Sequence, residues 1–183
     1  MTLWRYKNMN KLLSLIVFLG LLSGCATTNM VSDLYKINAS TDKIRQIYVK
    51  HKNELTPQEQ QALKDAWLKW QEIWETLDTN GCGLKHATKD VCKLDVATIQ
   101  ELHDTAQKTY EEIKPIVKAK EDKLTMQERI TLRQFDQAMQ KLDKNVMEFL
   151  ENPNNENQLL VIKGLSGLAV VGAKVAPMII GAL

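Results

Sequence analysis

The side chains best suited to catalysis or metal binding are scattered along this sequence. The three histidines, His51, His86 and His103, lie in unrelated segments, and no pair of Asp or Glu residues is set apart in apolar surroundings. The motifs HExxH, GxSxG, P-loop and GxGxxG, which supply zinc ligands, a nucleophile or phosphate-binding amides, do not occur in the sequence. We therefore expect no catalytic site, no cofactor and no metal centre, and predict that the protein is not an enzyme.

The first 24 residues differ in composition from the rest of the chain. They contain Arg5, Lys7 and Lys11 but no Asp or Glu, and an apolar run extends from Leu12 to Leu22. A helix needs about 20 residues to span a bilayer core, so this run is too short to do so. A basic start followed by a short apolar run is typical of an export signal that is removed from the mature protein. Lys11 lies between Met9 and the apolar run, so Met1 and Met9 are both candidates for the first residue of the protein.

The residues that follow this run are Leu22-Ser23-Gly24-Cys25, and they resemble the lipobox of bacterial lipoproteins. The resemblance is limited to the signal segment. It implies that residues 1–24 are removed, that Cys25 carries acyl chains such as palmitate, and that residues 25–32 form a lipidated linker. Because no Asp follows Cys25, it also implies an outer-membrane protein that faces the periplasm, if the host has an outer membrane. Several acyl chains make a durable anchor, since each buried CH₂ contributes about 0.8 kcal/mol. The alternative is an ordinary secretory signal with a cysteine at this place by chance.

The exported part of the chain contains two further cysteines, Cys82 and Cys92. In an oxidising compartment such a pair is typical of a disulfide bond, and closing the short loop between them stabilises a fold by about 2–3 kcal/mol. A zinc site formed by Cys82, His86 and Cys92 is an alternative, but it lacks a fourth ligand and a CxxC pair. We therefore predict a Cys82–Cys92 disulfide.

Composition excludes several classes of protein. The chain has 183 residues, of which 44% are hydrophobic and 25% charged, and this favours one modest globular core. Lys and Arg number 24 against 22 Asp and Glu, but three of the basic residues belong to the signal segment. The remainder is nearly neutral and has no basic stripe, so we expect no nucleic-acid partner.

Apolar residues recur every three or four positions along four segments of the mature chain, which predicts four amphipathic helices. We expect them to form two antiparallel hairpins, at 31–78 and 95–151. Together they make a four-helix bundle over residues 33–151 with coiled-coil-like packing. No segment alternates with period two for long enough to indicate a strand.

Local signals mark where these helices begin and end. Thr56 and Thr125 are each followed three residues later by Glu, which is a capping box at a helix start. Asn80-Gly81 and Asn152-Pro153 are typical of helix ends. Pro115 removes a backbone donor and predicts a kink near Lys114 in the third helix.

Three tryptophans, Trp67, Trp70 and Trp74, lie on one face of the second predicted helix. Their spacing and their large apolar area predict that they are buried between helices. An aromatic face for an apolar ligand or a partner protein is the alternative.

The segment from Leu159 to Leu183 has no acidic residue, and its only charges are Lys163 and Lys174. We expect an apolar helix over residues 158–183. It is long enough to cross a bilayer, but Lys174 and Pro177 disfavour a membrane span. It could pack on the bundle as a fifth helix, lie in a membrane interface or self-associate. The apolar residues that would contact a membrane are Leu165, Leu168, Val171, Met178 and Ile179.

The sequence therefore predicts an all-α protein: an antiparallel helical bundle of two hairpins plus an apolar C-terminal helix. The function that we expect is that of a non-enzymatic, lipid-anchored envelope protein that acts through protein–protein contacts on the periplasmic side. The alternatives are a membrane-active or membrane-bridging lipoprotein that uses its C-terminal helix, for example in phage-type exclusion, and a carrier of an apolar ligand.

Overall fold

The computed structural model describes residues 30–82 and 92–181, and within them the chain is all-helical. The five long helices are residues 30–51, α2 (Pro57–Leu77), α3 (Val96–Lys118), α4 (Met126–Glu151) and α5 (Asn155–Gly181). A short π-helical turn, Asp78–Cys82, follows α2, and a 3₁₀ turn, Glu121–Lys123, precedes α4. No strand occurs among these residues, so the predicted fold class is confirmed.

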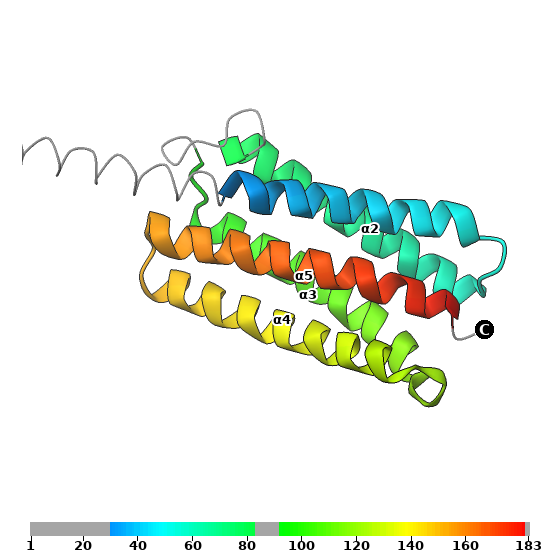
Figure 1. Ribbon diagram of the computed structural model, residues 1–183. Coiled ribbons are helices and arrows are strands. Elements are labelled where there is room, and N and C mark those ends of the chain that lie inside the picture. Colours follow the sequence, from blue (N-terminus) through cyan, green and yellow to red (C-terminus); the bar gives the residue numbers. More distant parts are fainter. Residues whose placement is uncertain (1–29, 83–91, 182–183) are drawn as a thin grey trace, which may run out of the picture.

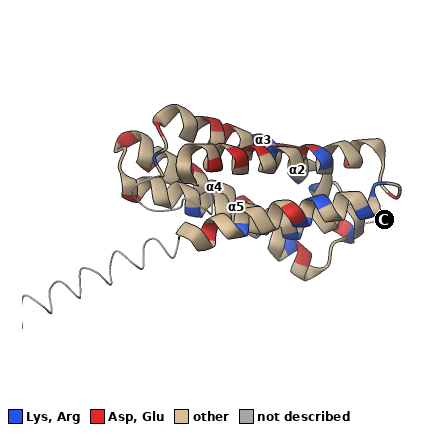
Figure 2. Cartoon of the chain, turned by 90° about the horizontal axis from the view of Figure 1, so that it is seen from above, with Lys and Arg blue, Asp and Glu red and all other residues tan. Residues whose placement is uncertain are grey.

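Each helix runs antiparallel to the one before it, and the helices lie in two layers. Figure 1 shows helix 30–51, α5 and α4 side by side, with α2 and α3 behind them. Figure 2, turned by 90°, separates the two layers and shows charged residues along the outer sides of the helices. The partners within the predicted hairpins do touch, since Tyr48 of helix 30–51 stacks on Trp67 of α2 and α3 packs on α4. The more extensive contacts, however, are those of α4 with α5 and of α2 with α3.

The predicted helix boundaries are confirmed by the hydrogen bonds at the helix ends. The backbone N–H groups of Thr56 and Thr125 each donate to the Glu three residues later, at 2.8 Å, and the threonine hydroxyls accept in return. Gly81 has a φ of 72°, a left-handed conformation that glycine adopts without strain. The cap of α3 is Asp95, which the sequence analysis did not identify. α3 contains Pro115 and continues beyond it to Lys118.

Two boundaries differ from those expected. The chain is already helical at residue 30, inside the range 25–32 assigned to a linker, because Met30 and Leu34 pack in the core. α5 begins at Asn155 and not at residue 158, since the side chain of Asn154 accepts a hydrogen bond from the N–H of Asn157 at 2.9 Å and caps the helix.

The C-terminal helix is part of the core of the bundle. Residues on most of its circumference are buried, including Ile162, Leu165, Leu168 and Val175. α5 packs closely on α4 and also contacts α3 and α2, and Ser166 donates a hydrogen bond to Asp33 of helix 30–51 at 3.3 Å. A helix that is apolar almost all around is buried in a protein core or in a membrane, and here the other helices cover it. The sequence left three arrangements open for this segment. In the structure it packs on the bundle as a fifth helix.

Candidate functional site

Cys25, the predicted lipid-attachment residue, lies outside the described residues. The other two cysteines form the expected bond, because the sulfur atoms of Cys82 and Cys92 are 2.04 Å apart. Both cysteines are fully buried, at the end of the bundle where residue 30 also lies. His86, the third ligand of the alternative zinc site, is outside the described part of the chain.

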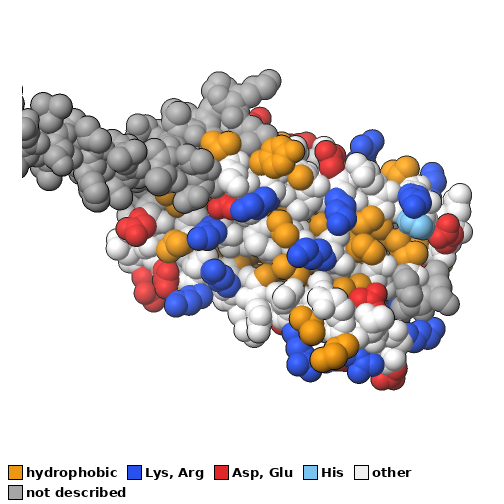
Figure 3. All heavy atoms as spheres, viewed as in Figure 1, with side chains coloured by type: hydrophobic (Ala, Val, Ile, Leu, Met, Phe, Trp, Pro, Cys, Tyr) orange, Lys and Arg blue, Asp and Glu red, His pale blue; other side chains and the backbone are white. Residues whose placement is uncertain are grey.

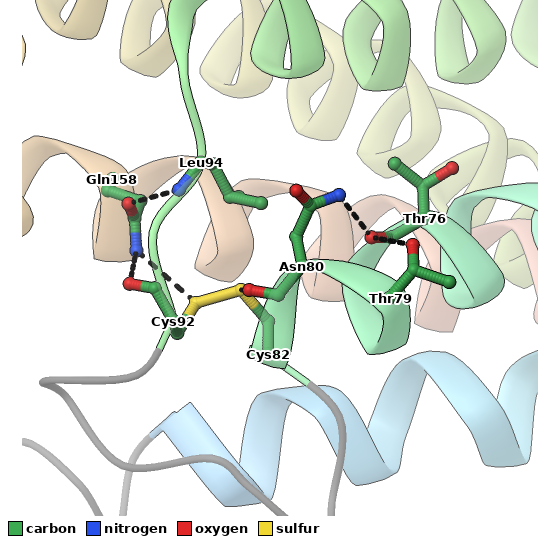
Figure 4. The surroundings of a disulfide bond; sticks show 7 residues. All are labelled: Thr76, Thr79, Asn80, Cys82, Cys92, Leu94 and Gln158. Atoms are coloured by element: carbon green, nitrogen blue, oxygen red, sulfur yellow. Dashed lines mark hydrogen bonds between the residues drawn. A yellow bond between two sulfur atoms is a disulfide. The ribbon is translucent and has the colours of Figure 1, made fainter.

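The disulfide is attached to the core through Gln158 of α5 (Figure 4). The Gln158 amide accepts from the backbone N–H of Leu94 and donates to the carbonyl oxygen of Cys92, both at 2.9 Å. Gln158 is only 4% exposed, so these bonds satisfy a polar group that would otherwise be buried without partners. Spacing in the sequence gave no sign of this contact across more than 60 residues.

The three tryptophans do not form one open surface. Trp70 is buried in the core, whereas Trp67 and Trp74 are partly buried against it. Trp67 stacks on Tyr48 of helix 30–51 at a ring distance of 6.4 Å, and the guanidinium of Arg45 lies 5.8 Å from its ring. The aromatic face is thus mostly used in packing helix 30–51 on α2.

The apolar residues suggested for membrane contact lie mainly inside the bundle. Leu165, Leu168, Met178 and Ile179 are buried, and only Val171 is partly exposed. α5 is long and apolar enough to cross a membrane, with a mean hydropathy of 1.8, but most of that stretch is covered by the other helices. The exposed residues of α5 form a strip that contains Lys163, Gly167, Lys174 and Pro177.

The structure brings His103 of α3 next to α4, a proximity that the sequence analysis missed. One ring nitrogen, Nε2, lies 2.8 Å from Asp143 of α4, and the other, Nδ1, lies 3.5 Å from the neighbouring Asp104. His51 pairs only with Glu54 in its own turn. In residues 30–82 and 92–181, no three His, Cys, Asp or Glu side chains are grouped so as to hold a metal ion.

His103 lies in a surface groove of about 450 Å³ between α3 and α4. α4 packs more closely on α5 than on α3, and the groove lies on its α3 side. Its apolar lining is Met139, Val146, Met147 and Leu150, and its acidic lining is Asp104, Glu111, Asp136 and Asp143. Of the residues that the structure describes, no Lys or Arg lines the groove, although Lys114 beside it forms an ion pair with Asp136 at 3.0 Å. Asp104, Glu111 and Asp143 have no Lys or Arg partner among those residues, so the groove is acidic and also has an apolar lining.

Helical spacing contains a signal that could have revealed this groove. Asp136, Gln140, Asp143 and Met147 follow one another at steps of four, three and four residues, so they share one side of α4. One side of α3 likewise carries Gln100, His103, Gln107 and Glu111. What the spacing does not tell is that these two sides face the same groove.

A chain of hydrogen bonds joins Lys114, Tyr110 and Asp136 along the groove. Lys114 donates to the Tyr110 hydroxyl at 2.6 Å, and that hydroxyl donates to Asp136 at 2.8 Å. Partial burial, together with the nearby Asp136, raises the pKa of Tyr110. The hydrogen bond to Tyr110, followed by that to Asp136, raises the pKa of Lys114. At neutral pH Lys114 is therefore a cation and Tyr110 a neutral phenol, so neither acts as a base.

The chain was compared with known protein families, with curated protein sequences and with solved structures. In none of these comparisons does it have a significant match.

Proposed function

We propose that this protein is a lipid-anchored protein of the bacterial cell envelope that binds a protein partner and catalyses no reaction. Its anchor is Cys25, and the domain faces the periplasm from the outer membrane. The observation that supports a binding function is the groove between α3 and α4, which combines an apolar lining with acidic side chains.

The chemistry of the groove indicates the kind of partner that it fits. Its α4 side extends from Asp136 to Leu150, which is about 21 Å along a helix axis. Met147 is 56% exposed, so it offers apolar surface to a partner that enters the groove. An amphipathic helix whose apolar face covers Met147 and whose Lys or Arg side chains meet Asp104 and Glu111 matches this surface.

The side chains of the groove favour binding over catalysis. Both ring nitrogens of His103 face carboxylates, and no Ser, Thr or Cys is among the residues that line the groove. A hydrolytic mechanism needs a nucleophile within hydrogen-bond reach of its base.

The alternative functions have weaker support. Insertion of α5 into a membrane would remove Leu165 and Leu168 from the core and leave the other helices without their central partner. An apolar ligand on the tryptophan face would have to displace Arg45 and Tyr48 from Trp67.

The partner proposal is tested by photocrosslinking in intact envelopes. A photoreactive amino acid replaces Met147 in the full-length protein, and the adduct is identified by mass spectrometry. We expect an adduct with a helical segment that is rich in Lys and Arg. The matched control has the same amino acid at Lys64, an exposed position on α2 away from the groove, and should not give this adduct.

Neutralising the groove makes the test specific. In the crosslinking variant, Asp104→Asn with Glu111→Gln should reduce the adduct several-fold, because both carboxylates are exposed and make no cross-helix bond that the fold needs. An adduct that is unchanged by these substitutions, or that contains only this protein, would refute a cationic partner.

The anchor is tested separately by metabolic labelling with radioactive palmitate. The full-length chain should take up label and fractionate with membranes, and Cys25→Ser should lose the label. A wild-type chain that stays unlabelled would contradict the lipid anchor without affecting the groove.

A further inference from the structure

A second surface depression, of about 380 Å³, lies where helix 30–51, α4 and α5 meet. Lys36, Lys141 and Lys163 contribute to it from these three helices, and we refer to it as the lysine cleft. Figure 3 shows the face on which these helices lie, with Lys and Arg side chains spread among apolar ones.

The lysine cleft has an excess of positive charge. Among the described residues, Asp33 is the only acidic one that lines it, and its carboxylate is already bonded to Lys36 at 2.9 Å and to Ser166 at 3.3 Å. Within the part of the chain that the structure describes, neither Lys141 nor Lys163 has an ion-pair partner. Two cations that face one depression without internal counter-charges favour an anionic ligand.

The wall of the cleft formed by α5 is apolar and partly open. It contains Gly164, Gly167, Val170 and Val171, and both valines are partly exposed. A Cβ atom built on Gly167 would meet no other atom within 4 Å, so the space above this glycine is unfilled. A cationic rim around an apolar wall is suited to an amphiphile, with a negative headgroup and hydrocarbon next to it.

The cleft is close to the proposed anchor along the chain. Met30 lies five positions after Cys25, and a fully extended chain of that length reaches about 18 Å at most. From Met30 the helix rises about 9 Å to Lys36. A lipid attached at Cys25 would therefore keep the lysine cleft near the headgroups of the membrane.

We propose that the lysine cleft binds the headgroup phosphate of an anionic phospholipid in the leaflet that holds the anchor. The cleft supplies Lys141 and Lys163 to the phosphate and the wall at Gly167 to the adjoining hydrocarbon. This inference rests on the proposed anchor only where it places the cleft near the membrane. The charge and apolar wall of the cleft do not depend on the anchor.

Binding of this kind also orients the partner groove. Ala138 and Lys141, which line the cleft, lie about 140–200° around α4 from Asp136, which lines the groove. With the lysine cleft against the membrane, the α3–α4 groove faces away from it, toward a periplasmic partner.

The test is flotation with vesicles of a soluble chain, residues 25–183 with Cys25→Ser, which contains every described residue and has no lipid. We expect it to float with phosphatidylcholine vesicles that contain about one third phosphatidylglycerol, and not with phosphatidylcholine alone. Lys141→Gln with Lys163→Gln should weaken binding by about tenfold or more.

The matched control is Lys64→Gln with Lys108→Gln. It removes the same charge from two exposed lysines of α2 and α3 that also have no ion pair in the described structure. It should change binding by no more than about twofold. Equal losses in the two double variants would overturn the proposal, because binding would then follow net charge alone.

A charge-neutral variant tests the shape of the cleft. Gly167→Gln places a polar side chain in the unfilled space, and we expect several-fold weaker flotation with a melting temperature no lower than that of the wild type. Binding that is unaffected by this variant would overturn the cleft as the site. Full competition by millimolar inorganic phosphate would also overturn it, since the ligand would then be a free anion.

These outcomes are separate from those of the proposed function. The soluble chain has no acyl group, so its flotation does not depend on whether Cys25 is lipidated. Failure of palmitate labelling with intact flotation would remove the anchor and leave the lysine cleft in place.

Discussion

The ammonium group of Lys120 lies 2.5 Å from the carboxylate of Glu59 and 2.6 Å from the carbonyl oxygen of Ile179. One side chain thus connects the start of α2 with the end of α5, at the opposite end of the bundle from the disulfide. Glu59 is 5% exposed, so its charge depends on this partner and on the capping threonine Thr56. The contact joins elements about 60 residues apart in the sequence.

Replacing Lys120 by Met should lower the free energy of unfolding by about 2–3 kcal/mol. The substitution keeps much of the apolar stem but leaves the buried Glu59 carboxylate without its counter-charge and the Ile179 carbonyl without a donor. Chemical denaturation followed by circular dichroism measures the change. Lys118→Met, at an exposed position nearby, should cost less than about 0.5 kcal/mol. Equal effects of the two variants would show that the Lys120 contact contributes nothing to the free energy of unfolding.

Stability should decrease in acid, and Glu59 should be one cause. Burial alone would raise the pKa of Glu59 and is the largest single influence, but the hydrogen bonds from Lys120 and Thr56 together outweigh it and lower this pKa below its usual 4.5. A pKa that is lower in the folded state gives stability that is present above the unfolded value and is lost as the pH falls through the folded value. Unfolding free energies measured from pH 7 to pH 3 should therefore decrease below about pH 4.5. Glu59→Gln should make that decrease shallower, and an unchanged slope would contradict the assignment.

Loss of the disulfide should destabilise the bundle without changing its helical content. Cys82 and Cys92 are ten positions apart, and the loss of a loop closure of this size costs about 2–3 kcal/mol. The double variant Cys82→Ser with Cys92→Ser, and wild type in reducing agent, should show the same decrease in denaturation midpoint. A thiol assay on the soluble unfolded Cys25→Ser chain should find no free cysteine. Two free thiols, or bound zinc, would contradict the bond.

Two glycines of α5 should respond to alanine in opposite directions. A Cβ on Gly164 would lie 3.0 Å from Asn145 Nδ2 and 3.1 Å from Leu142 Cδ1, whereas one on Gly167 meets nothing within 4 Å. Gly167→Ala should stabilise by up to about 1 kcal/mol, because alanine has the higher helix propensity. Gly164→Ala should destabilise by about 1–3 kcal/mol, since α4 must move away and Asn145 bonds to Leu160 at that point. Similar melting temperatures for the two variants would show that α5 is less closely packed on α4 than the structure has it.

The sequence by itself determined that the chain is helical and where several of the helices begin and end. Capping at Thr56 and Thr125, the turn at Gly81 and the stop after Glu151 depend on bonds between residues three or four positions apart, so local chemistry decides them. The apolar spacing likewise identified the buried side of each helix, as Leu63 and Trp70 of α2 or Phe135 and Leu142 of α4 illustrate. The Cys82–Cys92 bond was predictable because these are the only two cysteines that follow Cys25, the predicted lipid-attachment residue.

Only the tertiary structure decided how those helices face one another. The pairing of His103 with Asp143, the junction of Lys120 with Glu59 and the bond from Ser166 of α5 to Asp33 all join residues 40 or more positions apart. Such contacts depend on the rotation of each helix about its axis and on the order of helices around the core. Periodicity shows that a helix has a buried side, but not which neighbour covers it. The acidic groove and the lysine cleft are consequences of that arrangement, because each is formed where sides of different helices meet.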